Sequence, residues 1–320
     1  MRRFRFLTLA AGAATLQACD RPGGPAPAES EAAALTFPAA LEAIQALIAR
    51  DKADPLIAEF ALPRLYHHGK STDDAVVLFH GFTNCPQQFV ELAERFHARG
   101  CNVYVPRIPL HGYRDRLTRA LANLTVAQLE SATTDAYRLT RGLGRRVSAV
   151  GLSLGGTMAL YLAQTQPIDL AVPVSPFLMP IHVPDGIGLT AMRTLAHRPD
   201  RYVWWDPRVK EKCPPPYAYP GFPTHGLAQI VFFGNEVVKA SKLLRAPQGR
   251  ACTLVTNRNE SAVNNAITFD VMRAWKARGA RYGQVVLSDL GAPRHDIIDP
   301  TTFPQAATLV YPKLEAIVLG

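Results

Sequence analysis

The stretch VSAVGLSLGG, residues 147–156, decides the fold of this chain. Its first four residues are typical of a buried strand, and the apolar run from Leu154 to Gln166 is typical of a helix. Between them lies the pattern Gly-x-Ser-x-Gly, centred on Ser153. This pattern forms a sharp strand-to-helix turn that lifts a serine hydroxyl above the edge of a sheet, at the N-terminus of the following helix. The stretch therefore predicts a nucleophilic serine at the carboxyl end of a strand.

Strands and helices are expected to alternate on both sides of this turn. Strands are predicted at 75–79, 102–106, 147–150, 170–174, 252–256 and 284–288, and helices at 86–99, 125–141, 154–166, 262–278 and 304–318. The helix at 125–141 opens with a capping box of Thr125 and Gln128. Such alternation indicates a parallel sheet with helices on both faces. Residues 179–250 break the rhythm and are predicted to be an insertion between two strands.

Two further motifs carry a family resemblance. His80-Gly81-Phe82-Thr83 follows the first strand, and PRIPLHG spans residues 106–112. With Ser153, they make the chain resemble the α/β-hydrolase superfamily, within it the carboxylesterase, monoacylglycerol lipase and serine aminopeptidase-like group. The resemblance covers residues 75–174 and 253 to the end, and not the insertion. It implies an α/β-hydrolase domain over 37–320, with a mostly parallel, doubly wound sheet and a cap insertion at about 179–250.

The resemblance also implies an oxyanion hole. One backbone amide belongs to the residue after the nucleophile, here Leu154, and the other to the turn after the early strand, here Phe82. Backbone amides suit this task because they are rigid donors. The resemblance implies structural roles for His80 and His111.

A serine hydroxyl needs a base, and the family order is serine, acid, histidine. His295 follows the last strand and is the expected base. Glu260 follows the strand at 252–256 and is the expected acid, although the family usually has aspartate there, three residues before a valine. Asp289 is the alternative acid.

These residues predict a serine hydrolase that cleaves carboxylic esters, including lipid esters, through an acyl-enzyme. Two alternatives stay open, namely a peptidase or amidase of the aminopeptidase-like group and a non-catalytic binding protein of the bacterial envelope. The chain carries no metal-ligand spacing, dinucleotide fingerprint or P-loop, so no cofactor or metal is expected. Aromatic residues of the insertion could wall an acyl pocket or form a small core of their own; they are Trp204, Trp205, Tyr217, Tyr219 and Phe222.

The N-terminus resembles a bacterial lipoprotein signal. A basic start, MRRFR, precedes a mostly apolar run over 6–18 that is too short to span a membrane. It ends in Leu-Gln-Ala-Cys, which resembles a lipobox with Cys19 as the lipidated residue. The prediction is a signal peptide over 1–18, a Pro- and Gly-rich tether over 19–36, and a lipid anchor in the bacterial cell envelope. Asp20 resembles an inner-membrane retention signal, so the protein is expected on the inner membrane, facing the periplasm.

Composition limits the other function classes. Of the 320 residues, 48% are hydrophobic, which excludes a mainly disordered chain. The formal charge of +9 falls to +6 when the three signal-peptide arginines are removed, and the remaining basic residues are not interleaved with aromatic ones. A nucleic-acid partner is therefore not expected. Four cysteines besides Cys19 allow three disulfide pairings, and the sequence does not choose among them.

Overall fold

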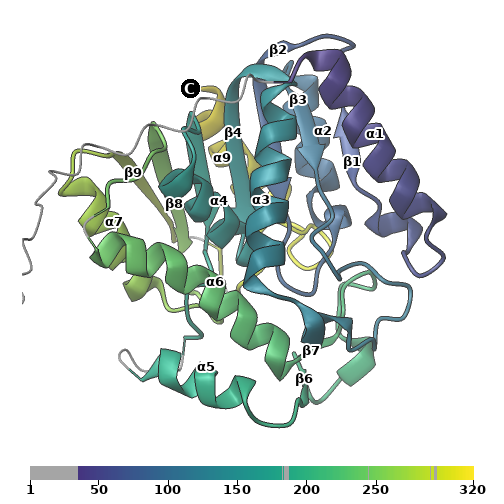
Figure 1. Ribbon diagram of the computed structural model, residues 1–320, viewed down its shortest axis with the longest axis vertical. Helices are drawn as coiled ribbons and strands as arrows, with labels where there is room; N and C mark the ends of the chain where they lie inside the picture. The colour runs from purple at the N-terminus through teal and green to yellow at the C-terminus, as the bar shows by residue number, and fades with distance from the viewer. Residues whose placement is uncertain (1–34, 182, 184–186, 244, 289, 292–293) are drawn as a thin grey trace, which may run out of the picture. The chain divides into compact units, whose positions relative to one another are not determined.

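The computed structural model describes residues 35–181, 183, 187–243, 245–288, 290–291 and 294–320 (Figure 1). Within this part of the chain, seven strands form one sheet in the order β1-β3-β2-β4-β5-β8-β9. The strands are β1 (Arg64–Tyr66), β2 (Thr72–Phe79), β3 (Asn102–Val105), β4 (Gly144–Leu152), β5 (Leu170–Val174), β8 (Ala251–Asn257) and β9 (Arg281–Leu287). Only β1 runs antiparallel to its neighbour, β3. The predicted α/β-hydrolase fold, a mostly parallel sheet with helices, is confirmed.

The register of the central strands brings the loops after β2 and β4 to the same edge of the sheet. Strand β2 pairs with β4 from Thr72 opposite Gly144 to Phe79 opposite Gly151. The residues that follow these strands, His80 and Ser153, therefore leave the sheet at neighbouring positions. The long apolar runs of β2 and β4 are expected for parallel strands that are covered on both faces.

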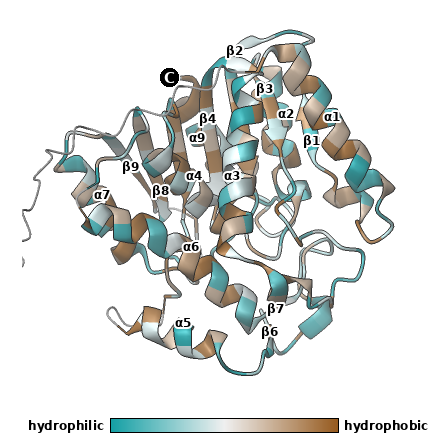
Figure 2. Cartoon of the chain, viewed as in Figure 1, coloured by the Kyte–Doolittle hydropathy of each residue, from teal (hydrophilic) through white to brown (hydrophobic). Residues whose placement is uncertain are grey.

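Alternate residues of the strands face opposite layers. Val77 of β2 belongs to one core cluster, together with buried residues of α1 (Phe37–Ala53), α3 (Val126–Arg141), α4 (Leu154–Thr165) and α7 (Asn265–Lys276). Val76 belongs to the other, together with buried residues of α2 (Val90–Ala98), α8 (Ala306–Leu309) and α9 (Tyr311–Leu319). Figure 2 shows strand β4 mainly in brown and helix α3 in mixed teal and brown, as expected for a buried strand and a helix with one buried face.

Each strand and helix predicted above has a counterpart in the structure, several with ends shifted by a few residues, and three of the differences in the helices have a clear physical reason. The helix predicted from Pro86 opens as the 3₁₀ turn η2 (Pro86–Phe89) before α2. The helix predicted from Ala262 begins at Asn265, because the Asn264 side chain caps it by accepting from the Ala266 amide. The last helix is broken at Val310, because the following helix carries a proline at its start, where an amide donor is missing.

The insertion lies between β5 and β8. It contains α5 (Gly188–Ala196), β6 (Tyr202–Trp204), the 3₁₀ turn η4 (Lys210–Lys212), β7 (Gly221–Pro223) and α6 (Thr224–Lys242). Strands β6 and β7 form a small antiparallel sheet, and α6 packs against α3, α4 and α7. In the part of the chain that the structure describes, no helix is both long and apolar enough to cross a bilayer.

Candidate active site

Ser153 lies in a strained turn at the end of β4. Its φ is +60°, in the left-handed region that costs energy for any residue with a Cβ. The turn is held by its backbone, because the Ser153 amide donates to Val174 O at 3.0 Å and its carbonyl accepts from the Phe177 amide at 3.0 Å. A Cβ at Gly151 would collide with the Gly155 carbonyl, and a Cβ at Gly155 with the Phe79 carbonyl. Both glycines of the motif are therefore required for the close approach of α4 to the sheet.

The turn after β2 orients the peptide that carries the Phe82 amide. The Gly81 carbonyl accepts from the Asn84 amide at 3.1 Å and from His80 Nδ1 at 3.0 Å. In a trans peptide the N–H points away from the C=O, so these bonds fix the direction of the Phe82 N–H. Among the described residues, no protein acceptor takes the Phe82 amide. The Leu154 amide is the first of α4 and has no intrahelical acceptor.

The structure brings Glu260 and His295 together. His295 Nδ1 lies 2.8 Å from Glu260 Oε1, and the Glu260 side chain is 3% exposed. A carboxylate accepts only, so Nδ1 carries the proton and Nε2 keeps its lone pair. His295 Nε2 is buried and has no hydrogen-bond partner among the described residues. The imidazole is thus oriented as a base on the Nε2 side.

The backbone after β8 stabilises the Glu260 carboxylate. Oε1 also accepts from the amides of Ser261 at 2.9 Å and Ala262 at 2.8 Å. Burial raises the pKa of Glu260, but the hydrogen bond and charge of His295 and the hydrogen bond from the Ala262 amide lower it more, so that the net shift is downward. Glu260 is therefore ionised, and its negative charge lies beside the His295 ring, where it would stabilise an imidazolium.

Side chains that the sequence did not single out tie the acid loop to the histidine loop. Asn257 Nδ2 donates to Arg294 O at 2.9 Å, and the Arg294 amide donates to Asn259 O at 3.0 Å. Asn259 Nδ2 donates to Gly291 O at 2.8 Å. No motif could have identified them, since each bond joins positions more than thirty residues apart.

Ser153 and His295 line the same cavity, of about 490 Å³. Phe82 also lines it, so the predicted serine, base and one oxyanion donor share one space. The cap contributes a mostly apolar wall to this cavity. The residues of that wall are Trp205, Cys213, Pro214, Pro215, Ala218, Tyr219, Phe222, Leu227 and Ile230.

The five cap aromatics divide between the two roles that were left open. Trp205, Tyr219 and Phe222 line the cavity. Trp204 instead packs edge-on against Tyr202, with ring centroids 5.0 Å apart. Tyr217 donates its hydroxyl to the Asp299 carboxylate at 2.6 Å, next to the histidine loop.

The cap also contacts the oxyanion turn directly. Trp205 Nε1 donates to Thr83 Oγ1 at 2.9 Å, and the Tyr219 amide donates to Thr83 O at 2.8 Å. Thr83 has a φ of +68° and is 4% exposed. These two bonds compensate for part of the cost of that backbone conformation.

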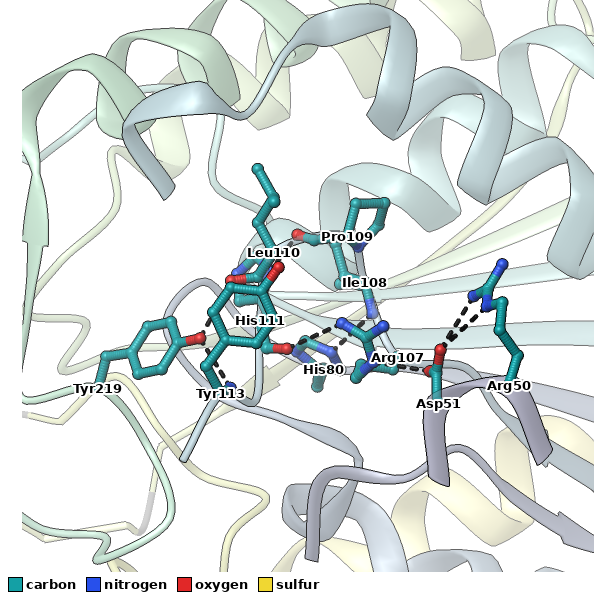
Figure 3. A network of polar contacts seen from close by, with 10 residues as sticks. All are labelled: Arg50, Asp51, His80, Arg107, Ile108, Pro109, Leu110, His111, Tyr113 and Tyr219. Carbon is teal, nitrogen blue, oxygen red and sulfur yellow. Dashed lines mark hydrogen bonds and ion pairs between the residues drawn. The ribbon is translucent and has the colours of Figure 1, made fainter. Parts of the chain in front are cut away.

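Beneath the turn lies a network of polar contacts, drawn in Figure 3. His80 Nε2 accepts from the Ile108 amide at 3.1 Å, which together with its Nδ1 bond fixes a neutral imidazole. His111 Nδ1 donates to Pro109 O at 2.9 Å. Burial lowers the pKa of His80 well below its usual value and that of His111 to about 4. Both histidines hold the loops in place as neutral groups.

Helix α1 is joined to this network by a buried ion pair. Arg107 Nε lies 2.7 Å from Asp51 Oδ2, with side chains 10% and 3% exposed. Burial raises the pKa of Asp51, but the hydrogen bond and charge of Arg107, helped by Arg50, lower it overall. Arg107 also donates to His111 O at 3.0 Å, so the pair supports the loop to which the Tyr219 hydroxyl is bonded at Leu110 and Tyr113 (Figure 3).

The remaining predicted residues are the lipidation site, the alternative acid and the other cysteines. Cys19 and the alternative acid Asp289 lie outside the described residues. The four other cysteines are free thiols in the structure, with Cys85, Cys101 and Cys252 buried. Within the described ranges, no cluster of three or more His, Cys, Asp or Glu side chains could hold a metal ion.

Sequence comparison finds relatives among lipases and esterases. Over 94 residues the chain is 36% identical to a thermostable monoacylglycerol lipase of Bacillus sp. (strain H-257), covering 29% of this chain and 36% of the lipase. Over 115 residues it is 30% identical to a carboxylesterase of Bacillus subtilis (strain 168), covering 36% of this chain and 44% of that enzyme. The chain thus matches less than half the length of each relative.

Solved structures share the fold over a longer range. A structure of the metagenome-derived lipolytic enzymes LipS and LipT has a TM-score of 0.61 at 21% identity, covering 82% of this chain and 99% of that chain. The monoacylglycerol lipase of Paleococcus ferrophilus has a TM-score of 0.57 at 16% identity, covering 79% and 98%. Residues 76–315 match the alpha/beta hydrolase family. Because this match takes in most of the chain and includes Ser153, Glu260 and His295, the protein belongs to the alpha/beta hydrolase family.

Proposed function

We propose that this chain is a serine hydrolase that cleaves carboxylic esters through an acyl-enzyme. Ser153 is the nucleophile, His295 the general base and Glu260 the acid that orients it. The observation that carries the proposal is His295 itself. Its Nδ1 is bonded to a buried carboxylate, and His295 lines the cavity that Ser153 also lines.

The expected steps use these groups in turn. Ser153 attacks the acyl carbon while His295 Nε2 takes the hydroxyl proton, and Glu260 stabilises the imidazolium that forms. The amides of Phe82 and Leu154 bind the developing oxyanion, each contributing about 3 kcal/mol to the lowering of the barrier. His295 then returns the proton to the leaving alkoxide. Water releases the acyl group in a second round of the same chemistry.

An ester with an apolar acyl group suits the cavity. Its wall is formed by Phe82, Trp205, Phe222 and Ile230, and the comparisons place lipases and a carboxylesterase among the relatives. The amino group of a peptide substrate would need a free carboxylate. Asp296 is the one acidic side chain among the described residues that line the cavity, and its oxygens are already bonded to Gln88 and to two backbone amides. This favours ester cleavage over aminopeptidase activity.

Two measurements test the proposal together. A fluorophosphonate probe should label the wild type at Ser153, and Ser153→Ala should lower turnover of p-nitrophenyl esters by about six orders of magnitude without lowering the melting temperature. A series from acetate to palmitate measures the length of acyl chain that the cavity accepts. Labelling at another residue, with turnover surviving Ser153→Ala, would refute the assignment.

The second part of the proposal concerns location. The mature protein begins at a lipid-modified Cys19 and is anchored in the bacterial cell envelope, on the inner membrane facing the periplasm. The support is the lipobox-like stretch before Cys19, with Asp20 after it. Stable anchoring takes more than one acyl chain. Intact mass of membrane-extracted protein tests this, and a soluble product with a free N-terminus at another residue would contradict it.

A further inference from the structure

Gln88 connects two loops of the active site that lie far apart in the chain. It lies in η2 and is 2% exposed, yet it lines the catalytic cavity. Its Oε1 accepts from the Gly81 amide at 2.8 Å, and its Nε2 donates to Asp296 Oδ2 at 2.7 Å. One side-chain amide thus spans the space between the oxyanion turn and the histidine loop.

At one end, Gln88 fixes the peptide before the oxyanion donor. The Gly81 carbonyl is already held by His80 Nδ1 and the Asn84 amide. With its N–H held by Gln88 as well, Gly81 has both of its polar backbone groups bonded. Gln88 therefore holds the peptide that precedes the one carrying the Phe82 N–H, next to the carbonyl whose bonds set the direction of that N–H.

At the other end, Gln88 holds the residue next to the base. Asp296 follows His295 directly, and its Oδ1 accepts from the amides of Ile298 and Asp299, each at 3.0 Å. That leaves Oδ2 for Gln88 Nε2. The turn 295–299 is therefore fixed on its inner side by Asp296 and joined to the oxyanion turn by one bond.

The donors and acceptors select the side chain at position 88. A backbone N–H only donates, and an ionised carboxylate only accepts. A residue between them must accept at one end and donate at the other, which a neutral amide does. Glutamate at this position accepts only, and an apolar side chain does neither.

We propose that Gln88 is a positioning residue that holds the oxyanion donor of Phe82 and the base His295 at a fixed separation. The inference rests on the proposed ester hydrolysis, in which both groups act on one transition state. Misplacement of about 1 Å can cost about 100-fold in rate. The effect should therefore fall on kcat rather than on KM, because the positions matter most when charge develops.

Single substitutions test the bridge. Gln88→Met keeps the length and removes both bonds, and Gln88→Glu keeps the shape and removes the donor. Each should lower kcat for p-nitrophenyl butyrate by about 10- to 100-fold, with KM changed by less than about threefold and with slower fluorophosphonate labelling of Ser153. Gln87→Met, on the same turn but partly exposed, is the matched control and should retain wild-type kcat. If Gln88→Met does not fold, the kcat of Gln88→Glu alone tests the positioning role.

A double variant reverses the polarity of the bridge. Asp296→Asn alone sets an amide donor against Gln88 Nε2 and should lower kcat as Gln88→Glu does. Combined, the two substitutions let the new carboxylate accept from both Gly81 N–H and the new amide, at unchanged net charge. The double variant should have a kcat at least tenfold higher than that of the less active single variant.

Three outcomes distinguish a failure of the positioning role of Gln88 from a failure of the proposed function. Wild-type kcat in Gln88→Met, with only a lower melting temperature, would overturn the positioning role and leave the proposed function intact. Losses that multiply in the double variant would overturn it too. A wild type that neither hydrolyses esters nor reacts with the probe would refute the proposed function, and the inference with it.

Discussion

At the scale of single residues, the proposed acid is the member of the site that departs from the pattern expected from the family resemblance. Glu260 stands where an aspartate is usual, one carbon longer, and its Oε1 binds His295 Nδ1 together with the amides that follow it. The longer side chain is accommodated because the loop turns its own N–H groups toward the carboxylate. That arrangement leads to a prediction about charge and reach.

Glu260→Gln should lower kcat by about 10³- to 10⁴-fold, because a neutral amide can favour the wrong imidazole tautomer and cannot balance an imidazolium. Glu260→Asp should keep part of the activity, since the charge remains and only reach is lost. Ester turnover and melting curves on the purified variants provide the measurement. Asp289→Asn is the control; an inactive Asp289→Asn beside an active Glu260→Gln would move the acid to position 289.

Ser153 could be named from the sequence because its motif lies between a strand and a helix that their own apolar patterns predict. His295 and Glu260 were expected from the family order, at positions after predicted strands. The side chains that support them could not be named in this way. Gln88 and Asp296 are 208 positions apart, and Asn257 reaches Arg294 across 37. Such pairs depend on how the strands are ordered in the sheet, which local patterns do not contain.

At the scale of elements, a helix or strand could be predicted where its own residues carry a capping or periodic pattern. The capping box at Thr125 is present as expected, with both of its bonds formed. Strand β1 has three residues at the edge of the sheet, too few for a periodic pattern. The sequence also did not indicate that α7 begins after Ala262. The Ser261 and Ala262 amides donate to the Glu260 side chain, which is distinctive only once the loop is folded.

Helix α1 is held to the loop after β3 by the Asp51–Arg107 pair, so Asp51→Ala should destabilise the protein strongly. It leaves a guanidinium 10% exposed and without its carboxylate, which costs about 3–5 kcal/mol. The exposed pair of Asp73 and Arg145, with side chains 74% and 75% exposed, is the control. Asp73→Ala should cost less than about 1 kcal/mol. Urea unfolding of both variants makes the comparison, and equal losses would contradict it.

At the scale of the whole molecule, three buried groups set how stability depends on pH. The unfolded chain binds protons on His80 and His111 below about pH 6.5, and the native protein does not, since burial lowers both pKa values. Asp299 acts in the opposite direction. Burial and the charge of Asp296 raise its pKa to about 6, so that the native state takes up a proton there before the unfolded state does.

Near pH 5 these groups leave the unfolded state with a net excess of about one proton. The free energy of unfolding should therefore fall by about 1.4 kcal/mol for each pH unit as the solution is acidified. Asp299→Asn removes the opposing carboxyl, and the slope should roughly double. Urea titrations between pH 4.5 and 6 measure both slopes; an unchanged slope in the variant would show that Asp299 is not protonated in the native state.

The bonds between the cap and Thr83 bear on how enzymes of this kind could exchange parts. The insertion leaves β5 and re-enters at β8, and these strands are neighbours in the sheet. Because these strands run parallel, the insertion leaves at the carboxyl end of β5 and returns at the amino end of β8, so a replacement segment must also supply the crossover between the two edges of the sheet. Trp205 and the Tyr219 amide both donate to Thr83 in the oxyanion turn. A transplanted cap that lacks these two donors would leave a strained residue unsupported, so recombination at these seams should yield active chimaeras only from donor caps that replace both bonds.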